Sequence, residues 1–245
     1  MKKAKILFYD IEILPRHFNT CFGADRSTLC TFGYKWGTDP KARYLDLLHF
    51  PDSWEKSPFA EEELVHAAHK IMIQADQCVH HYGDKFDFKY MNTKFLLLGL
   101  DPLTIRDVDL FDTWKGSKYN LKLSNNRMDT IARYFGLKPK DENEVGWWFD
   151  TIARDPKALR KISKYCAGDV ETLHQVAMKL NPITPTKRRL CGPDLNLCPE
   201  CGSVRWENKQ KYTTAAGYVT MVLRCKDCRK TWTMPEAKYL ALRSF

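Results

Sequence analysis

Residues 6–13, Ile-Leu-Phe-Tyr-Asp-Ile-Glu-Ile, place two acids inside an otherwise apolar stretch. Apolar and β-favouring residues dominate it, which predicts a buried β-strand. Side chains alternate across a strand, so Asp10 and Glu12 project from the same face. Two carboxylates held side by side in a low-dielectric interior repel each other, and a cation such as Mg²⁺ or Mn²⁺ neutralises them. The alternative is an edge strand whose acids face water.

The rest of the first 180 residues alternates between strand-like and helix-like patterns. Further strands are expected at residues 28–36, 42–49, 77–82 and 108–111. Helices are expected at residues 61–75, 87–98, 127–135 and 156–180. Loops are expected at residues 51–58 and 115–125. The first three strands read as an antiparallel meander, and later strands alternate with helices, so we expect an α/β domain with a mixed sheet flanked by helices.

The sequence between residues 182 and 186, Pro-Ile-Thr-Pro-Thr, reads as a linker. We therefore expect two domains, 1–182 and 183–245, which the 245 residues can supply. Residues 185–245 carry 12 Lys and Arg against 5 Asp and Glu, a net charge of +7 of the chain's +9. A small basic module indicates a polyanionic partner, most often nucleic acid. The alternative is a basic surface that serves only solubility.

The sequence shows no pattern typical of a targeting signal. No apolar run approaches the length that spans a bilayer, and the N-terminus enters the first strand without a signal-peptide pattern. We therefore expect a cytoplasmic protein without a membrane partner.

Two further acids fall at positions that suit the same site. Asp87 follows the strand at 77–82, and an acid at such a turn can face a cleft at the strand ends. Its alternative role is a helix N-cap, and Asp84 competes with it as the turn residue. Tyr165 and Asp169 are four residues apart in the long helix and share its apolar face. An acid there needs a partner, unless it lies at a helix boundary with access to water.

Three motifs, Phe-Tyr-Asp-Ile-Glu, Gly-Asp-Lys-Phe-Asp and Tyr-Cys-Ala-Gly-Asp, resemble those of the DnaQ-like, ribonuclease H-like 3′–5′ exonucleases. The resemblance covers roughly residues 4–180 and is closest to the DEDDy branch, which has Tyr in the third motif. It implies the ribonuclease H-like fold and an active site with two Mg²⁺ or Mn²⁺ ions. The implied metal ligands are Asp10, Glu12, Asp87 and Asp169. Tyr165 would orient the attacking water, because its ordinary pKa of about 10 makes it a poor base.

The sequence departs from this family at two places. Relatives often have Thr after the motif Glu, where this chain has Ile13. Many have Asn a few residues before the second-motif Phe-Asp, where His80, His81 and Tyr82 stand here. Neither departure removes a metal ligand, but both affect the region expected to contact the 3′ end of a substrate. Asp112, at the end of a short strand, is expected to have a structural or supporting role.

The C-terminal module contains two Cys-x-x-Cys pairs separated by 23 residues. The pairs are Cys198 with Cys201 and Cys225 with Cys228, a spacing typical of a structural Zn²⁺ site of the zinc-ribbon type. Strands are expected at residues 203–206 and 218–223, and Cys191 is a possible competing ligand. Basic residues interleaved with aromatic ones suit a surface that tracks a nucleic-acid backbone. These basic residues are Lys209, Lys211, Arg224, Lys226, Arg229 and Lys230.

The combined expectation is a two-metal 3′–5′ exonuclease that releases nucleoside monophosphates, with the zinc ribbon gripping nucleic acid. Single-stranded 3′ ends are the expected substrate, with DNA favoured over RNA. A ribonuclease H-like endonuclease is the alternative within catalysis. A non-catalytic nucleic-acid-binding or protein-binding adaptor that uses the ribbon is the alternative outside it. Docking of the ribbon onto a replication, transcription or repair protein is compatible with the first reading.

Overall fold

The strand at the centre of the molecule's larger sheet is β1 (Ile6–Pro15). The sheet order is β3-β2-β1-β4-β5. The other strands of this sheet are β2 (Ser27–Trp36), β3 (Arg43–Asp46), β4 (Gln77–His80) and β5 (Asp109–Asp112). β1, β2 and β3 pair antiparallel, whereas β4 and β5 run parallel to β1. The expected meander and mixed sheet are therefore confirmed.

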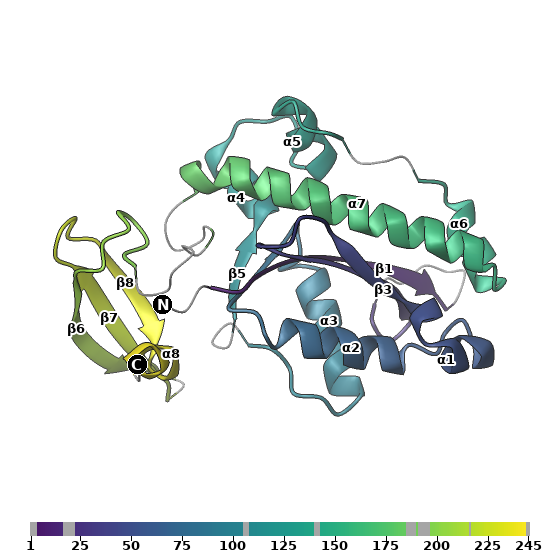
Figure 1. The fold of residues 1–245 in the computed structure, drawn as a ribbon, viewed down its shortest axis with the longest axis horizontal. Helices are drawn as coiled ribbons and strands as arrows, with labels where there is room; N and C mark the ends of the chain where they lie inside the picture. Colours follow the sequence, from purple (N-terminus) through teal and green to yellow (C-terminus); the bar gives the residue numbers. More distant parts are fainter. Residues whose placement is uncertain are drawn as a thin grey trace. The chain divides into compact units, whose positions relative to one another are not determined.

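The computed structural model describes residues 4–16, 23–104, 108–139, 143–184, 190, 197–215 and 217–243. The chain divides into two compact units, Lys5–Thr184 and a smaller one made of Met1–Ala4 with Pro185–Phe245 (Figure 1). Cys191, the possible competing zinc ligand, lies outside the described residues. Among the described residues, no helix has the length and apolar character needed to cross a bilayer.

Helices cover both faces of the larger sheet. They are α1 (Pro51–Lys56), α2 (Glu62–Met72), α3 (Asp87–Leu97), α4 (Thr113–Asn120), α5 (Met128–Tyr134), α6 (Gly146–Ile152) and α7 (Pro156–Leu180). Short 3₁₀ turns follow β3 at Leu47–His49 and α7 at Asn181–Ile183. Figure 1 shows α7 running along one face of the sheet, with α2 and α3 on the opposite face. The apolar residues of β1 join one core with α2 and α3, whereas the acids lie on the side facing α7.

In the larger unit, two segments expected to be loops are helical, and the helix α6 was not anticipated. α1 begins with Pro51 at its first position, where proline's fixed φ and missing N–H suit a helix start. α4 begins after Asp112, whose carboxylate accepts from the Trp114 N–H and caps the helix. α6 was missed because its Gly-Trp-Trp-Phe sequence has weak helix propensity, and packing against α7 stabilises it instead.

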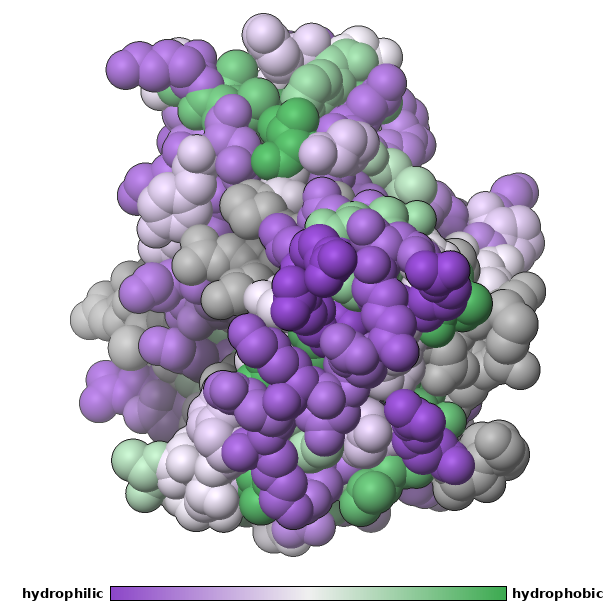
Figure 2. All heavy atoms as spheres, turned by 90° about the vertical axis from the view of Figure 1, so that its left-hand side faces the viewer, coloured by the Kyte–Doolittle hydropathy of each residue, from purple (hydrophilic) through white to green (hydrophobic). Residues whose placement is uncertain are grey.

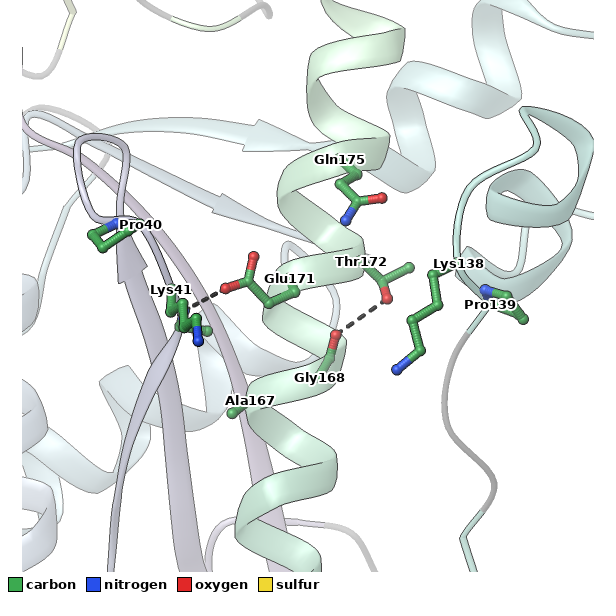
Figure 3. A pocket seen from close by; sticks show the side chains of 10 residues that line it. Pro40, Lys41, Lys138, Pro139, Ala167, Gly168, Glu171, Thr172 and Gln175 are labelled. Atoms are coloured by element: carbon green, nitrogen blue, oxygen red, sulfur yellow. Dashed lines mark hydrogen bonds between the residues drawn. The ribbon is translucent and has the colours of Figure 1, made fainter.

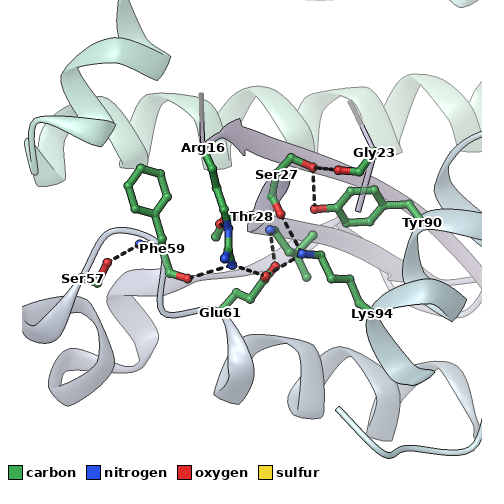
Figure 4. A network of polar contacts seen from close by, with 10 residues as sticks. Arg16, Gly23, Ser27, Thr28, Ser57, Phe59, Glu61, Tyr90 and Lys94 are labelled. Atoms are coloured by element: carbon green, nitrogen blue, oxygen red, sulfur yellow. Dashed lines mark hydrogen bonds and ion pairs between the residues drawn. The ribbon is translucent and has the colours of Figure 1, made fainter. Parts of the chain in front are cut away.

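A buried polar network ties the outer end of β1 to β2, α2 and α3 (Figure 4). Glu61 accepts from the Lys94 ammonium at 2.6 Å, from Arg16 at 2.9 Å and from the Leu29 N–H at 2.6 Å. The Lys94 ammonium also donates to the Ser27 carbonyl at 2.7 Å. Each charge in the network has several partners, so no buried charge is left unpaired. The network therefore holds the C-terminal end of β1 in place.

The smaller unit contains a three-stranded antiparallel sheet and one helix. Its elements are β6 (Trp206–Thr213), β7 (Val219–Cys225), β8 (Thr231–Pro235) and α8 (Glu236–Arg243). The strand expected at 203–206 is wrong, because β6 begins only at Trp206, after the turn that carries the first cysteine pair. The core is small, with Met221, Leu223 and Met234 packed against half-buried aromatic rings. The face viewed in Figure 2 carries mainly hydrophilic side chains, with smaller hydrophobic groups between them.

Candidate active site

The two acids of β1 meet a third acid from α7. Asp10 and Glu12 are half-buried, and Asp169 is only 1% exposed. One carboxylate oxygen from each lies within 4.8 Å of the others. Three negative charges at this separation repel one another, and burial of Asp169 strengthens the repulsion. The hard oxygens and their spacing suit a divalent cation such as Mg²⁺ or Mn²⁺.

A glycine on β2 lets α7 come close enough to bring Asp169 to the strand acids. Gly33 pairs with Asp10 in the antiparallel register. A Cβ at Gly33 would lie 2.7 Å from the Cys166 Sγ and 3.1 Å from the Cys166 carbonyl oxygen. The Cys166 thiol donates to the Asp10 carbonyl at 3.4 Å, so helix and strand are in direct contact. Sequence reasoning missed Gly33, although a lone glycine inside a strand is a known signal of close backbone approach.

Asp87 lies beside the three-acid group but does not belong to it. It is 6% exposed and is the first residue of α3, whose N-cap is Phe86 without a side-chain cap bond. Its carboxylate accepts from the backbone N–H of Ile11, the residue between Asp10 and Glu12. Burial raises the pKa of Asp87 to about 6, with a smaller contribution from Asp112, while His80 and backbone N–H groups act in the opposite direction.

This position of Asp87 follows from the short pairing between β1 and β4. Ile6–Phe8 of β1 pair with residues 77–79 of β4, so Asp87 can bond to β1 beyond that pairing. The N-cap alternative for Asp87 is therefore wrong, and the acid faces the strand that carries the other predicted ligands.

Tyr165 stands one helical turn before Asp169 and is half-buried. Its ring contacts Trp148 of α6 edge to face, with centroids 6.5 Å apart and an interplanar angle of 76°. Edge-to-face contact is a favourable arrangement of aromatic rings and restricts the orientation of both. The unanticipated helix α6 therefore supplies a side chain that orients Tyr165.

A second cluster, formed by His80, Asp84 and Asp112, lies at the ends of β4 and β5. The His80 Nε2 lies 2.9 Å from an Asp84 oxygen, and Lys115 forms an ion pair with Asp84. Burial opposes ionisation of Asp84, but hydrogen bonds from His80 and Lys115 outweigh it and lower the pKa of Asp84 to about 2. Donors from the protein itself satisfy this cluster, which suits a structural role for Asp112.

The four cysteines of the smaller unit converge on one point. Their sulfur atoms all lie within 4.8 Å of one another, with separations of 3.6 Å for Cys198–Cys228 and for Cys201–Cys225. Four thiolates at the usual Zn–S distance of 2.3 Å form a tetrahedron with edges of about 3.8 Å. The sulfur separations fit that tetrahedron, so this cluster of cysteines is compatible with a zinc ribbon.

Three of the six predicted nucleic-acid-binding residues are ion-paired within the smaller unit. Lys211 pairs with Glu236 at 2.7 Å, Lys226 with Glu207 at 3.4 Å and Lys230 with Glu200 at 3.6 Å. Exposed pairs of this kind are weak and are readily exchanged for other anions. The other three are spread over the unit: Lys209 at a bulge in β6, Arg224 within β7 and Arg229 in the β7–β8 turn. The aromatic residues divide between half-buried Trp206 and Trp232 and exposed Tyr212 and Tyr218.

Two cavities flank α7 and the strand acids. One, of about 460 Å³, lies over the outer side of α7 between Lys41 and Lys138 (Figure 3). Its polar groups are partly engaged, because Glu171 accepts from the Ala42 N–H and Thr172 donates to the Gly168 carbonyl. The other, of about 570 Å³, is lined in part by Asp10. Of these two cavities, the second includes a predicted metal ligand, Asp10.

Comparison with solved structures finds a similar fold in a family B DNA polymerase from the hyperthermophilic archaeon Pyrobaculum calidifontis. The TM-score is 0.50 and the sequence identity 14%, so the likeness concerns the fold. It covers 89% of this chain and 32% of the polymerase, and the chain therefore spans about a third of that protein. Among curated proteins, none matches.

A family model described as the RNase_H superfamily matches residues 7–181, which include all five predicted catalytic residues. Membership in that family supports nuclease activity in general terms, and it agrees with the mixed sheet and the acids on its central strand. The chain belongs to the ribonuclease H superfamily.

Proposed function

We propose that this protein is a metal-dependent 3′–5′ exonuclease of the DnaQ-like, DEDDy type. The observation that carries the proposal is the convergence of Asp10, Glu12 and Asp169 within 4.8 Å. Asp87 bonds to the same stretch of β1, and Tyr165 lies one turn from Asp169. A Tyr at this place, rather than His, distinguishes the DEDDy branch in the resemblance drawn above.

Each residue has a defined task in this proposal. Asp10, Glu12 and Asp169, with Asp87 beside them, hold two Mg²⁺ or Mn²⁺ ions. When bound, such ions lower the pKa of water and stabilise charge on the attacking and leaving oxygens of a phosphodiester. Tyr165, fixed by Trp148, orients the water by hydrogen bonding. The burial that raises the pKa of Asp87 favours its pairing with a cation, because a cation compensates the unfavourable charge.

The smaller unit is proposed to be a Cys₄ zinc ribbon that holds the nucleic acid near the active site. A core of three buried apolar residues is too small to stabilise such a unit alone, so the metal is expected to contribute folding free energy. Tethering a second binding module raises the local concentration of substrate without adding chemistry. Removal of zinc by a zinc-selective chelator, with Mg²⁺ kept in excess, should therefore unfold this unit, seen as loss of near-ultraviolet signal from Trp206 and Trp232. It should raise KM more than it lowers kcat.

The test of activity uses 5′-labelled single-stranded DNA and RNA oligonucleotides with Mg²⁺ or Mn²⁺, beside an Asp169→Ala protein. A ladder that shortens from the 3′ end, and that is absent in EDTA and in the variant, supports the exonuclease and reveals the sugar preference. Internal cuts indicate a ribonuclease H-like endonuclease instead. Metal-independent binding with no cleavage of either polymer indicates an adaptor in which the ribbon alone is functional.

A further inference from the structure

Three alternating residues of β2 face α7 in a row: Thr31, Gly33 and Lys35. In the antiparallel register this row lies beside the acids of β1, with Gly33 next to Asp10 and Thr31 next to Glu12. Gly33 admits the helix backbone, as described above. The other two residues bond to polar side chains of α7 on either side of that close approach.

At one end of the row, Lys35 is a buried cation. Its side chain is only 5% exposed, and its ammonium donates to the Glu171 carboxylate at 2.7 Å and to the Pro40 carbonyl at 3.4 Å. The other Glu171 oxygen accepts from the Ala42 N–H (Figure 3). Lysine is rarely buried unless it is paired, so Glu171 is what allows a charged Lys35 at this position. Glu171 therefore bonds α7 both to β2 and to the β2–β3 turn, two residues after Asp169.

At the other end of the row, α7 is bonded through Ser163, six residues before Asp169. The Ser163 hydroxyl lies 3.1 Å from the Thr31 hydroxyl and donates to the Asp46 carboxylate at 2.7 Å. All three of these side chains are buried. Loss of one partner would leave the others unsatisfied in the interior, so this contact strongly favours a single arrangement.

The two bonded ends match in spacing. The four-residue step from Thr31 to Lys35 spans about 13 Å of strand, and the eight-residue step from Ser163 to Glu171 spans about 12 Å of helix. Hydrogen bonds depend on direction, whereas burial of apolar groups does not. A helix that slipped by one residue would break both ends, move Asp169 by about 1.5 Å along the axis and turn it by about 100°.

We propose that Glu171, held by Lys35, is a positioning residue that sets where Asp169 meets Asp10 and Glu12. The inference rests on the proposed function, because it takes the three acids as the ligands of a divalent cation. Metal affinity depends on the mutual placement of the ligands, and loss of a group that orients a ligand costs about 10- to 100-fold in affinity. The Lys35–Glu171 pair therefore controls metal affinity through the position of α7, separately from its contribution to stability.

The experiment separates position from stability by removing the pair in two ways. Lys35→Met and Glu171→Ala each leave one charge without its partner, which destabilises the fold. Lys35→Met combined with Glu171→Leu replaces both charges by apolar groups, which is often neutral for stability but removes the directional bonds. Asp39→Ala is the control, because it removes an ion pair with Arg43 whose partners both lie in the β2–β3 hairpin.

Mn²⁺ affinity of the full chain is measured from the paramagnetic resonance of the free ion, and an Asp169→Ala protein identifies the binding that belongs to the acids. Urea unfolding in EDTA measures stability, and hydrolysis of a 5′-labelled oligonucleotide at saturating Mn²⁺ measures activity. We expect both single variants and the double variant to raise the Kd for Mn²⁺ about tenfold, with Asp39→Ala within about twofold of wild type. Only the two single variants should lose stability.

Wild-type Mn²⁺ affinity in the double variant overturns the inference, because the pair then serves stability alone; if wild type is active, the exonuclease still stands. If wild type binds Mn²⁺ through Asp169 but cleaves nothing, a tenfold loss of affinity in the double variant supports the positioning role while the proposed function fails. Absence of Asp169-dependent Mn²⁺ binding overturns both.

Discussion

Two groups of acids lie at neighbouring ends of the same sheet, and they differ in the side chains that are gathered with them. In the first group Asp10, Glu12 and Asp169 bring three carboxylates together. In the second group Asp84 and Asp112 are bonded to His80, Lys115 and three backbone N–H groups. The comparison teaches that acids grouped with a histidine, a lysine and backbone N–H groups suit a role in the fold, whereas three carboxylates converging on one point suit a divalent cation. We therefore expect the first group to hold a metal ion and the second to stabilise the fold.

The sharpest test of this difference is Asp169→Asn. Because the change removes one metal-binding charge, we expect an activity loss of about a thousandfold, consistent with metal stabilisation of several kcal/mol. The free energy of unfolding of the metal-free protein should stay equal or rise, since one of three repelling charges is gone. Hydrolysis rates and urea unfolding in EDTA measure the two effects. A large loss of metal-free stability would assign Asp169 to the fold instead.

The substitution Gly33→Ala should keep α7 from approaching the first group of acids. The added Cβ would lie 2.7 Å from the Cys166 Sγ, so helix and strand must separate and Asp169 must move away from Asp10. Misplacement of a catalytic group by about 1 Å can cost about a hundredfold in rate, and we expect a loss of that order.

Gly37→Ala is the matched control for that variant. Its added Cβ meets no atom closer than 3.5 Å, which is ordinary contact. Both proteins are assayed for hydrolysis with Mn²⁺ at equal concentrations. Equal activity of the two would contradict the account of how Asp169 is brought to the strand acids.

Substitution in the second group should instead lower the free energy of unfolding and leave metal affinity unchanged. Asp112→Ala removes the cap of α4 and the acceptor of the Tyr82 N–H. We expect it to lower the free energy of unfolding by about 2 kcal/mol, the sum of a lost cap and a lost hydrogen bond to a charged acceptor. Urea denaturation in EDTA measures it. Metal affinity, measured by titration with Mn²⁺, should remain within about twofold of wild type, and a collapse of that affinity would place Asp112 in the metal site.

A smaller effect is expected from the charge of Asp84, and it depends on pH. The pKa of Asp84 is lowered to about 2 in the folded protein, so its ionised form stabilises the fold above its ordinary pKa and this contribution is lost as pH falls toward 2. We expect Asp84→Asn to cost about 1 kcal/mol at pH 7, after allowance for partial solvent screening. Unfolding curves at several pH values should converge near pH 2. A difference that persists at that pH would point to lost packing instead of lost charge.

The smallest stability effect is expected at Tyr82, where the cost of the left-handed backbone and the benefit of the ring contact oppose each other. Tyr82→Gly relieves the strain but loses the contact with Trp114, so its free energy of unfolding should stay within about 0.5 kcal/mol of wild type. Thermal unfolding measures it. A clear loss of stability would mean that the Tyr82 ring supports the fold. The Tyr82–Trp114 pair would then have a structural role, like the second group of acids.

Much of the site could be predicted from the sequence, because its signals are local. The acids of β1 stand two residues apart on one strand, and Tyr165 and Asp169 stand one turn apart on one helix. The strand period and the helix turn fix which of these side chains face together. The two Cys-x-x-Cys pairs are equally local, and their convergence followed from the spacing. Short helices such as α1, α4 and α6 were not predicted, because packing and caps stabilise them and their sequences have no clear helical periodicity.

What sequence by itself determined about this protein is therefore the set of candidate acids, the order of the strands and longer helices in the larger unit, and the four cysteines. Only the tertiary structure decided which acids meet. Gly33 admits α7 to the sheet, Asp87 bonds to β1 beyond its pairing with β4, and Asp84 and Asp112 receive donors from segments far along the chain. These contacts join residues tens of positions apart, and no local period relates them. Their charge balance, and hence their separate roles, is a property of packing.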